Sequence, residues 1–355
     1  MDRKPLIGMM LGWKVEPALM RACAVAAAYH GADFYYFRAS DIGEHTIVGM
    51  KLEHDEWVRG EFRYPDAVYD NTRRRGIARF EAAYRKLDGI PMGHTIAGRS
   101  MTKTKVYKMV ERDPQLAQSL IPYKAVRESD ARDVIDFIER HERVIFKTNG
   151  GYLGRNALTA EFVEDGIELY DQQYKHRFAR EDLPRLIHML AAKKYFVQKL
   201  IRSVTPQGHP FHVRLHLSKN GAGRWIVAFH SIGLSLTPHV KVTNTDLTYR
   251  GTSTWADFLA NQFGEKENGP LHTRIDGYGL RMAEHLEKAA GGGFHEIGLD
   301  IGIDAEQRFW LFEAGIGLPR TSYYQLQLAL PAMAYTLRLL RADRGEPGNS
   351  GEPET

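Results

Sequence analysis

The sequence predicts a mixed α/β protein, and three patterns indicate this class. Residues 6–38 contain an apolar run, a helix-forming stretch and a second apolar run, which is the start of a strand–helix–strand unit. Asn220 and Gly221 separate two segments of alternating hydrophobicity, which is typical of a tight hairpin. Residues 269–313 hold a long helical pattern followed by two apolar strands. We therefore expect helices and strands interspersed along the chain (α/β, with α+β character).

The N-terminal elements are predicted from local composition. A helix is expected after the first apolar run, because Pro17 suits a first helical turn and the residues that follow are rich in alanine. Its neighbours are rich in apolar and aromatic residues, which favour strands. The predictions are a strand at 6–11, a helix at 17–30, and strands at 33–38, 56–63 and 65–70.

The basic stretch at 73–90 is predicted to be a helix. It opens with Arg73, Arg74 and Arg75, a triplet that also occurs in nucleic-acid-binding segments. No interleaved aromatic residues or second basic run accompany the triplet, so we interpret it as a solvated helix start.

The rest of the chain continues the alternation of helices and strands. Thr102 is a suitable helix N-cap, and Gly291 to Gly293 would end a helix. Residues 344–355 are rich in Gly, Pro and Glu and are predicted to be disordered. The further predicted helices are 102–112, 129–140, 181–193, 269–291 and 323–341, and the further strands are 143–147, 157–163, 167–170, 195–201, 211–217, 225–229, 296–304 and 309–313.

Composition excludes several classes of protein. With 48 Lys and Arg against 44 Asp and Glu, the net charge of +4 is too small for a dedicated nucleic-acid binder. Cys23 is the single cysteine, which excludes an internal disulfide or a cysteine zinc site, and we expect it to be buried. No run reaches the ~20 apolar residues of a membrane helix. We expect a soluble protein of a reducing compartment, with no membrane or nucleic-acid partner.

A lysine followed by glycines is the first candidate for chemistry. Lys147 ends a predicted strand, and Gly150, Gly151 and Gly154 follow it. Glycines allow backbone N–H groups to approach phosphate oxygens, and a nearby lysine adds positive charge. The order differs from the P-loop, in which the lysine follows the glycines. A plain hairpin is the more common structure for such a pattern.

Two acids on neighbouring predicted strands are the second candidate. Asp300 and Glu313 lie about a hairpin apart, so their carboxylates would converge. An acid beside strongly apolar residues is costly to bury unless it is paired or binds a cation, and Mg²⁺ prefers such ligands. Acids exposed at strand ends are the alternative, and Asp304 is interpreted as part of an ordinary turn.

Arg214 is the third candidate. It lies on an alternating strand, on the face opposite Val213 and Leu215, where it would brace a phosphoryl or carboxylate group. A surface arginine is the alternative. No His-Glu-x-x-His pattern occurs among the 15 histidines, so zinc hydrolase chemistry is unsupported.

The order of these motifs resembles the ATP-grasp superfamily, and within it the YheC/YheD-type (endospore coat-associated) branch. The resemblance covers roughly residues 60–325. Each motif is loose, and the ordered set is fairly specific. The matching segments are Pro65 to Asp70, Thr102 to Lys108, Phe196 to Ile201, Phe211 to Leu215, Glu296 to Asp304 and Phe309 to Glu313.

The resemblance implies a fold and a division of the chain. It implies an ATP-grasp fold with an N-terminal α/β domain at 1–98 and a lid-containing half at 99–200. A C-terminal mixed-sheet half with the metal site would follow at 201–341, and a disordered tail at 342–355.

The resemblance also implies roles for individual residues, with ATP and Mg²⁺ as cofactors. Arg214 would face the acyl phosphate or the acceptor, and Gly150 to Gly154 would form a mobile loop over the nucleotide. Further nucleotide contacts would come from Lys103, Lys147, Gln198, Leu200 and Asn244, and the metal ligands would be Asp300 and Glu313. In this set Lys103 and Lys147 contact phosphates, while Gln198 and Leu200 offer main-chain groups to adenine.

Three departures from the family pattern surround this site. Gly315 replaces the asparagine that is the third metal ligand, and His212 replaces an aspartate before Arg214. The paired glycines after Asn244 are reduced to Gly251. These departures raise the possibility of a weakened or lost activity.

The implied activity is ATP-dependent carboxylate–amine ligation through an acyl phosphate. Two alternatives stay open: a catalytically weakened nucleotide-binding or structural protein of the spore coat, and a kinase on the same fold. The resemblance implies a cytoplasmic location, with association with the forming spore. The sequence does not identify the substrate, although Arg and Tyr residues at 69–75 and 237–250 hint at an anionic partner.

Overall fold

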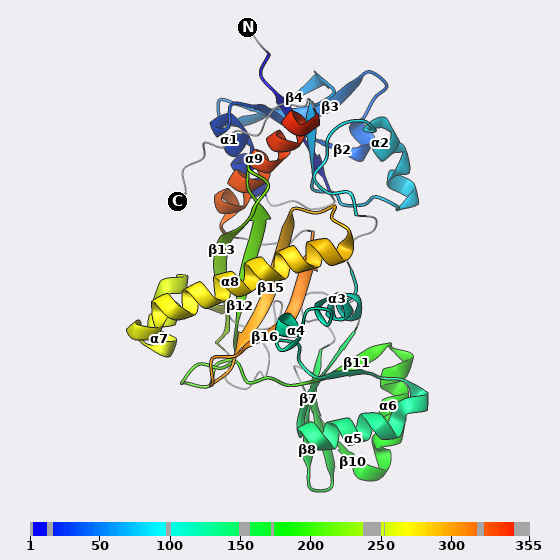
Figure 1. Ribbon diagram of the computed structural model, residues 1–355. Coiled ribbons are helices and arrows are strands. Elements are labelled where there is room, and N and C mark those ends of the chain that lie inside the picture. Colours follow the sequence, from blue (N-terminus) through cyan, green and yellow to red (C-terminus); the bar gives the residue numbers. More distant parts are fainter. Residues whose placement is uncertain are drawn as a thin grey trace.

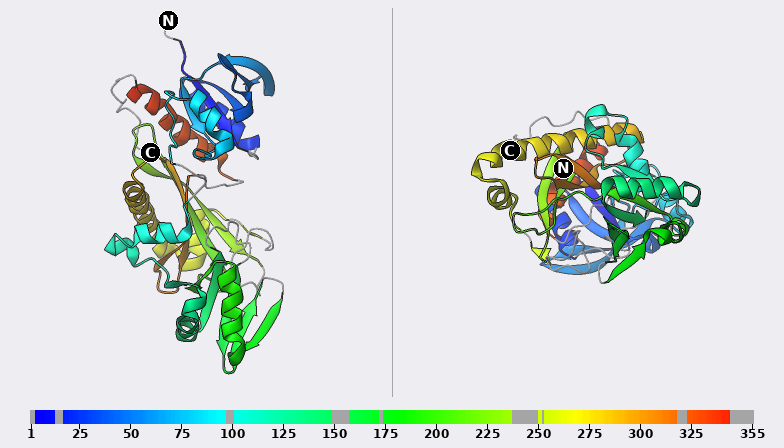
Figure 2. Two further views of the ribbon diagram at one scale, coloured as in Figure 1. Left: turned by 90° about the vertical axis from the view of Figure 1, so that its right-hand side faces the viewer. Right: turned by 90° about the horizontal axis from the view of Figure 1, so that it is seen from below.

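The computed structural model describes residues 3–12, 17–96, 101–148, 157–171, 174–236, 250–251, 253–317 and 323–343. These residues form three β-sheets that follow one another along the long axis of the molecule (Figure 1). Figure 2 shows the same succession from the side, and we call the sheets N-terminal, central and distal. Short 3-10 turns accompany them at Ala39–Asp41, Ala78–Phe80, Glu128–Asp130 and Arg180–Asp182.

The N-terminal sheet contains β1 (Leu6–Leu11), β2 (Asp33–Arg38), β3 (Thr46–Glu53), β4 (Glu56–Arg63) and β5 (Ala67–Asp70), with helices α1 (Pro17–Tyr29) and α2 (Glu81–Lys86). The strand order is β4-β3-β2-β1-β5, and β1 is parallel to both β2 and β5. Helix α1 connects β1 to β2, which confirms the strand–helix–strand prediction. Cys23 on α1 is buried, as expected.

The central sheet contains β12 (Phe211–Lys219), β13 (Trp225–Ser235), β14 (Arg250–Gly251), β15 (Glu296–Ile303) and β16 (Phe309–Ile316). Its order is β14-β13-β12-β15-β16, and all neighbours are antiparallel. The hairpin predicted at Asn220 and Gly221 joins β12 to β13. The helices beside this sheet are α3 (Lys103–Val110), α4 (Pro114–Ala117), α7 (Trp255–Phe263) and α8 (Glu265–Ala290).

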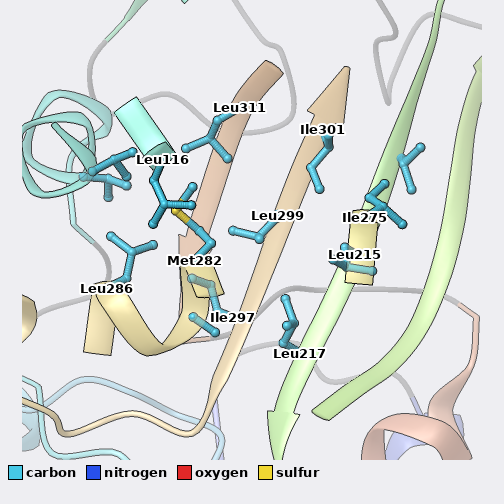
Figure 3. Close-up of a cluster of buried hydrophobic side chains, with 14 of the residues drawn as sticks. Leu116, Leu215, Leu217, Ile275, Met282, Leu286, Ile297, Leu299, Ile301 and Leu311 are labelled. Atoms are coloured by element: carbon cyan, nitrogen blue, oxygen red, sulfur yellow. The ribbon is translucent and has the colours of Figure 1, made fainter. Parts of the chain in front are cut away.

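One face of the central sheet packs against α8, which crosses it (Figure 1). In Figure 3, Leu299 on β15 and Leu215 on β12 lie in the same apolar cluster as Ile275 and Met282 of α8. All four side chains are fully buried. Because side chains alternate along a strand, the residues between them point to the other face. That other face carries the candidate site.

The distal sheet contains β6 (Tyr123–Ala125), β7 (Arg143–Thr148), β8 (Leu158–Val163), β9 (Gly166–Tyr170), β10 (Lys175–Ala179) and β11 (Tyr195–Lys199). Its order is β10-β9-β8-β7-β11-β6. Helices α5 (Ala131–His141) and α6 (Leu183–Ala192) pack against it and share its apolar core. The sheet therefore has its own core and holds β7 and β11 side by side.

The last helix, α9 (Gln325–Asp343), links two sheets. It packs against α1 and β5, and also against β12 and β13. Residues 344–355, predicted to be disordered, lie outside the described residues. None of the helices among the described residues is long and apolar enough to span a lipid bilayer.

The helix predicted at 73–90 is wrong for its first half. Only Glu81–Lys86 is α-helical, after a 3-10 turn. The carboxylate of Asp70 accepts backbone N–H groups from Arg73 and from the residue before it, each at 2.9 Å, and Arg73 has a φ of 49°. The segment is therefore a turn. The side chain of Arg73 is 2% exposed, so the solvated interpretation of the triplet is wrong for this residue.

The sequence predictions omit β3, β6, β10, β14, α4 and α7. Several of these are short, with three residues in β6 and two in β14. In β3 the apolar pattern is interrupted by Gly49, where a Cβ would lie 2.5 Å from the ring of Tyr35. The glycine is needed for close packing on the neighbouring strand, and this requirement is visible only in the fold.

Candidate active site

Three strands of the central sheet bring Arg214, Asp300 and Glu313 into one row. The register pairs Arg214 on β12 with Asp300 on β15, and Asp300 with Glu313 on β16. Directly opposite residues in antiparallel strands share one face of the sheet. Val213 and Leu215 are fully buried on the α8 side, so the row lies on the other face. The expected convergence of the two acids is thus present.

The negative charge of Asp300 is balanced by the nearby Arg214, but one of its carboxylate oxygens accepts no well-directed hydrogen bond. Nε of Arg214 lies 2.7 Å from Oδ1 of Asp300, and Nε2 of His212 lies 3.6 Å from the same oxygen. Nevertheless, Oδ1 is buried and accepts no well-directed hydrogen bond from any described group. The contact with Arg214 is therefore a contact of charges, and the oxygen retains a free lone pair for a cation.

Lys103 reaches the same row from helix α3. Its Nζ lies 3.3 Å from Oε1 of Glu313. The helix starts at Lys103 because the hydroxyl of Thr102 accepts the backbone N–H of Lys105, at 3.4 Å, which confirms the predicted N-cap. The cap fixes the helix start and with it the position of the lysine.

Lys147 approaches from the distal sheet, near the end of β7. Its Nζ donates to Oε1 of Gln198 at 2.9 Å and lies 5.9 Å from the ring centre of Phe312. The pKa of Lys147 is lowered to about 8, mainly by burial and also by the nearby Lys103, while Glu313 and Asp300 act in the opposite direction. Because burial disfavours the charged form of Lys147, an anion bound beside its ammonium group would stabilise that form.

Gln198 is fully buried on β11 and connects three elements. Besides accepting from Lys147, its Nε2 donates to the hydroxyl of Tyr107 at 3.3 Å. Tyr107 in turn donates to the backbone carbonyl of Phe312 at 3.2 Å. The sequence reasoning missed Tyr107. Its position four residues after Lys103, on the same face of α3, was the available signal.

Leu200 lies just after β11. Its backbone N–H donates to the carbonyl of Arg143 at 2.9 Å, and the N–H of Lys199 donates to the carbonyl of Pro122 at 3.0 Å. Both N–H groups are therefore engaged within the protein. Recognition of adenine by Leu200 would therefore use the carbonyl group of Leu200, or would require the hydrogen bond from its N–H to Arg143 to break.

Four predicted nucleotide-binding residues cannot be placed. Gly150, Gly151 and Gly154 follow Lys147 in the chain, and Asn244 precedes β14. All four lie outside the described residues.

Gly315 leaves an open position beside the row. It pairs with Gly298 on the neighbouring strand β15. A Cβ built on Gly315 would meet only the carbonyl oxygen of Gly298, at 3.8 Å, which is ordinary contact. The third metal ligand of the resembled family therefore has no counterpart here, but a side chain would fit.

Three potential metal ligands meet on the opposite face of the central sheet. The ligand atoms of His230, His272 and Asp276 lie within 4.8 Å of one another. His230 Nε2 is 2.7 Å from Asp276 Oδ1, and Trp255 donates to Nδ1 of His272 at 2.9 Å. That bond leaves the proton of a neutral His272 on Nε2, facing the other oxygen of Asp276 at 3.3 Å. Hydrogen bonds account for the cluster, so we assign no metal to it.

Comparison with known proteins shows the family to which the chain is related. Residues 94–332 match the model of the YheC/D like ATP-grasp family. The chain is also similar to the endospore coat-associated protein YheD of Bacillus subtilis (strain 168), with 23% identity over 310 residues, which are 80% of this chain and 64% of that protein. The chain thus matches less than two thirds of this relative's length.

Two solved structures show the same fold at low identity. The VanG D-Ala:D-Ser ligase of Enterococcus faecalis has a TM-score of 0.54 and 11% identity, over 95% of this chain and all of that chain. The ATP-grasp ligase PsnB, complexed with a minimal precursor, has a TM-score of 0.52 and 13% identity, over 94% and 99% of the two chains. The fold is therefore that of the ATP-grasp ligases.

Proposed function

Because the chain belongs to the YheC/D-like ATP-grasp family, we propose that it is an ATP- and magnesium-dependent carboxylate–amine ligase. The observation that carries the proposal is the row of Arg214, Asp300 and Glu313, approached by Lys103 and Lys147 from two other elements. Phosphoryl transfer requires mainly positioning and charge neutralisation, and this set of residues offers both.

The nucleotide phosphates would lie between Lys103 and Lys147. Lys103 is held by Glu313 and Lys147 by Gln198, so both ammonium groups are positioned before ATP binds. The loop containing Gly150, Gly151 and Gly154 would cover the phosphates, and Asn244 would approach from its own loop. Main-chain groups of Gln198 and Leu200 would recognise adenine.

Asp300 and Glu313 suit a magnesium ion. They are carboxylates on adjacent strands, and Oδ1 of Asp300, which lies near Arg214 but accepts no well-directed hydrogen bond, is the kind of oxygen that Mg²⁺ takes as a ligand. When bound, Mg²⁺ would neutralise phosphate charge. Water can fill the position that Gly315 leaves without a ligand, because Mg²⁺ commonly retains several waters.

The proposed reaction has two steps. A substrate carboxylate attacks the γ-phosphorus of ATP, ADP leaves, and an acyl phosphate forms. An amine then attacks the carbonyl carbon, loses a proton and displaces phosphate. Arg214 would stabilise negative charge on the acyl phosphate, and Lys147 would stay in contact with the phosphoryl group during its transfer. A kinase would share the first step, so only the amine-dependent product separates the two activities.

Calorimetric titration with ATP and Mg²⁺ tests the nucleotide site. The wild type is expected to bind, Lys147→Ala to bind at least about ten-fold more weakly, and Lys175→Ala to bind as the wild type does. Lys175 is a matched control, because it is an exposed lysine of the same distal sheet, paired with Glu168. Absence of binding to the wild type would exclude both ligase and kinase.

Two departures from the family pattern favour a second function, a nucleotide-binding or structural protein with little turnover. Gly315 removes a metal ligand and His212 replaces an acid next to Arg214. The B. subtilis relative is described as endospore coat-associated. The corresponding proposal for this chain is a cytoplasmic protein that associates with the forming spore. Full binding of ATP without ADP release, across carboxylate and amine pairs, would favour this function.

A further inference from the structure

Unsatisfied polar atoms gather where the N-terminal and central sheets meet. Among the described residues, the buried atoms without a hydrogen-bond partner include Nδ2 of Asn71, Nη1 of Arg73, Nδ1 of His94, and both ring nitrogens of His216. Each of these four side chains is at least nine-tenths buried. A buried donor without a partner is unfavourable, so such a cluster marks a place where water or a ligand completes the contacts.

The topology of the N-terminal sheet points to the same place. Strand β1 has β2 as its parallel neighbour on one side and β5 on the other. In open parallel sheets, ligands bind outside the carboxyl ends of the strands where the chain changes direction in this way. Here those ends continue into Gly12 and into Asn71 to Arg73. A Cβ on Gly12 would lie 3.6 Å from the backbone oxygen of Asn71, so the two loops are in contact.

One terminal nitrogen of the Arg73 guanidinium is available to bind an anion. Its Nη2 pairs with Glu296, whereas Nη1 has no partner among the described residues. A Cβ added to Gly317 would lie 3.1 Å from this Nη1 and 3.2 Å from Cε1 of His94, so the two side chains flank one point. The pKa of His94 is lowered to about 3, mainly by burial and also by the charge of Arg73. His94 is therefore neutral there and able to donate one N–H.

A strip of glycine connects this place to the catalytic row. Glu296, Gly298 and Asp300 alternate on one face of β15, and Gly298 pairs with Gly315 on β16. Two adjacent positions between Glu296 and Asp300 therefore carry no side chain. Four residues of strand separate Glu296 from Asp300 by about 13 Å. This is the length of about four residues of extended peptide.

We propose that Asn71, Arg73 and His94 bind the distal carboxylate of an extended, peptide-like substrate whose reacting end lies at Asp300 and Arg214. The proposal rests on the proposed function for the identity of the reacting end. The donors supply N–H groups, and one terminal nitrogen of the Arg73 guanidinium stays available beside its pair with Glu296, which favours a carboxylate over a neutral amide. The three donors are enclosed in this structure, so binding requires the loop at 71–73 and the end of β16 to separate.

Tetra-alanine and tetra-alanine amide are the probes, titrated into the full-length protein by calorimetry at constant ionic strength. The acid is expected to bind about ten-fold or more tightly than the amide. Arg73→Lys retains a cation for Glu296 but loses the second arm of the guanidinium, and should remove the preference. Asn71→Ala should reduce it, and provides the test if Arg73→Lys fails to fold. Arg79→Lys, at an exposed arginine six residues later, should leave it unchanged.

Equal binding of acid and amide, binding of neither, or a preference that survives in both Arg73→Lys and Asn71→Ala would overturn the proposal. A titration with ATP and Mg²⁺ on the same samples separates the two hypotheses. If the acid is preferred but ATP does not bind, the carboxylate site stands and the ligase function fails. If ATP binds but the preference is absent, the ligase function stands and the carboxylate site fails.

Discussion

Arg73 and Glu296 form a buried ion pair that joins the N-terminal sheet to the central sheet. Their side chains are 2% and 0% exposed, and they lie 223 residues apart in the chain. The hydroxyl of Tyr69 donates to the other oxygen of Glu296 at 2.9 Å. Burial by itself raises the pKa of Glu296, but the Arg73 guanidinium beside it holds the net pKa below the ordinary value. The two sheets are thus fixed by charge as well as by apolar contact.

Breaking this pair is expected to destabilise the protein strongly. Glu296→Gln conserves the shape but leaves the Arg73 charge buried without compensation, which costs about 3–5 kcal/mol in the free energy of unfolding. Urea denaturation followed by circular dichroism measures the change. Asp165→Asn, which breaks an exposed pair with Arg177, is the control and should have little effect. A loss below about 1 kcal/mol for Glu296→Gln would show that the pair is not a fixed contact.

ATP affinity should fall as the pH rises through 8. The pKa of Lys147 is lowered to about 8, so its ammonium loses a proton well before a lysine with the ordinary value of 10.5. Above pH 8 Lys147 is mostly neutral and must take up a proton when the phosphate binds, so the affinity declines by up to about ten-fold per pH unit. Calorimetry between pH 6.5 and about 9.5 follows the decline. Lys147→Arg stays charged and should flatten it; a decline of equal size in this variant would assign the effect to another group.

Asp300→Asn should weaken the contribution of magnesium to ATP binding. The substitution removes the charge of the proposed ligand while conserving its shape, so binding in Mg²⁺ should fall by a factor of about ten or more, with little change in EDTA. Asp276→Asn alters an acid on the opposite face of the same sheet and is the control. If only Asp276→Asn reduced the dependence on Mg²⁺, the metal site would have to be placed at the His230 cluster.

Gly315→Asn should strengthen the metal site. A Cβ built at position 315 would meet only the carbonyl oxygen of Gly298, at 3.8 Å. The amide oxygen of an asparagine there is therefore free to bind a metal ion held by Glu313. Lower half-saturation by Mg²⁺ and faster ADP release are expected. Gly315→Ala adds the Cβ without a ligand and separates a steric effect from coordination. Equal behaviour of the Asn and Ala variants would argue against a third ligand here.

Buried histidines should make the fold sensitive to acid. The pKa of His216 is lowered to about 3, mainly by burial and also by Arg214 and Arg73, whereas Glu296 acts in the opposite direction. Between pH 6.5 and about 3 the unfolded chain therefore binds a proton that the folded protein does not, and stability decreases as the pH falls. His216→Leu should reduce the pH dependence of the unfolding free energy by about one proton in this range. An unchanged slope would show that His216 is protonated in the folded state.

Several elements were predictable from local chemistry alone. The alanine-rich helix after Pro17, the Thr102 cap and the turn at Asn220 depend on neighbouring residues, so the printed sequence indicates them. The convergence of Asp300 and Glu313 was also predictable, because a short hairpin joins their strands, whereas the pairing of Arg214 with Asp300 joins strands that are far apart in the sequence. The sequence motifs likewise indicated the family before the fold was known.

Other features depend on contacts between distant segments. The sequence favoured a solvated helix at Arg73, because no neighbouring residue indicates that Arg73 pairs with Glu296. Tyr107 and Gln198 meet Lys147 only when the distal sheet lies against α3. The sequence by itself determined the elements, the family and the types of residue available for chemistry. The tertiary structure decided which charges are buried together, because burial and pairing across sheets depend on positions that no local pattern specifies.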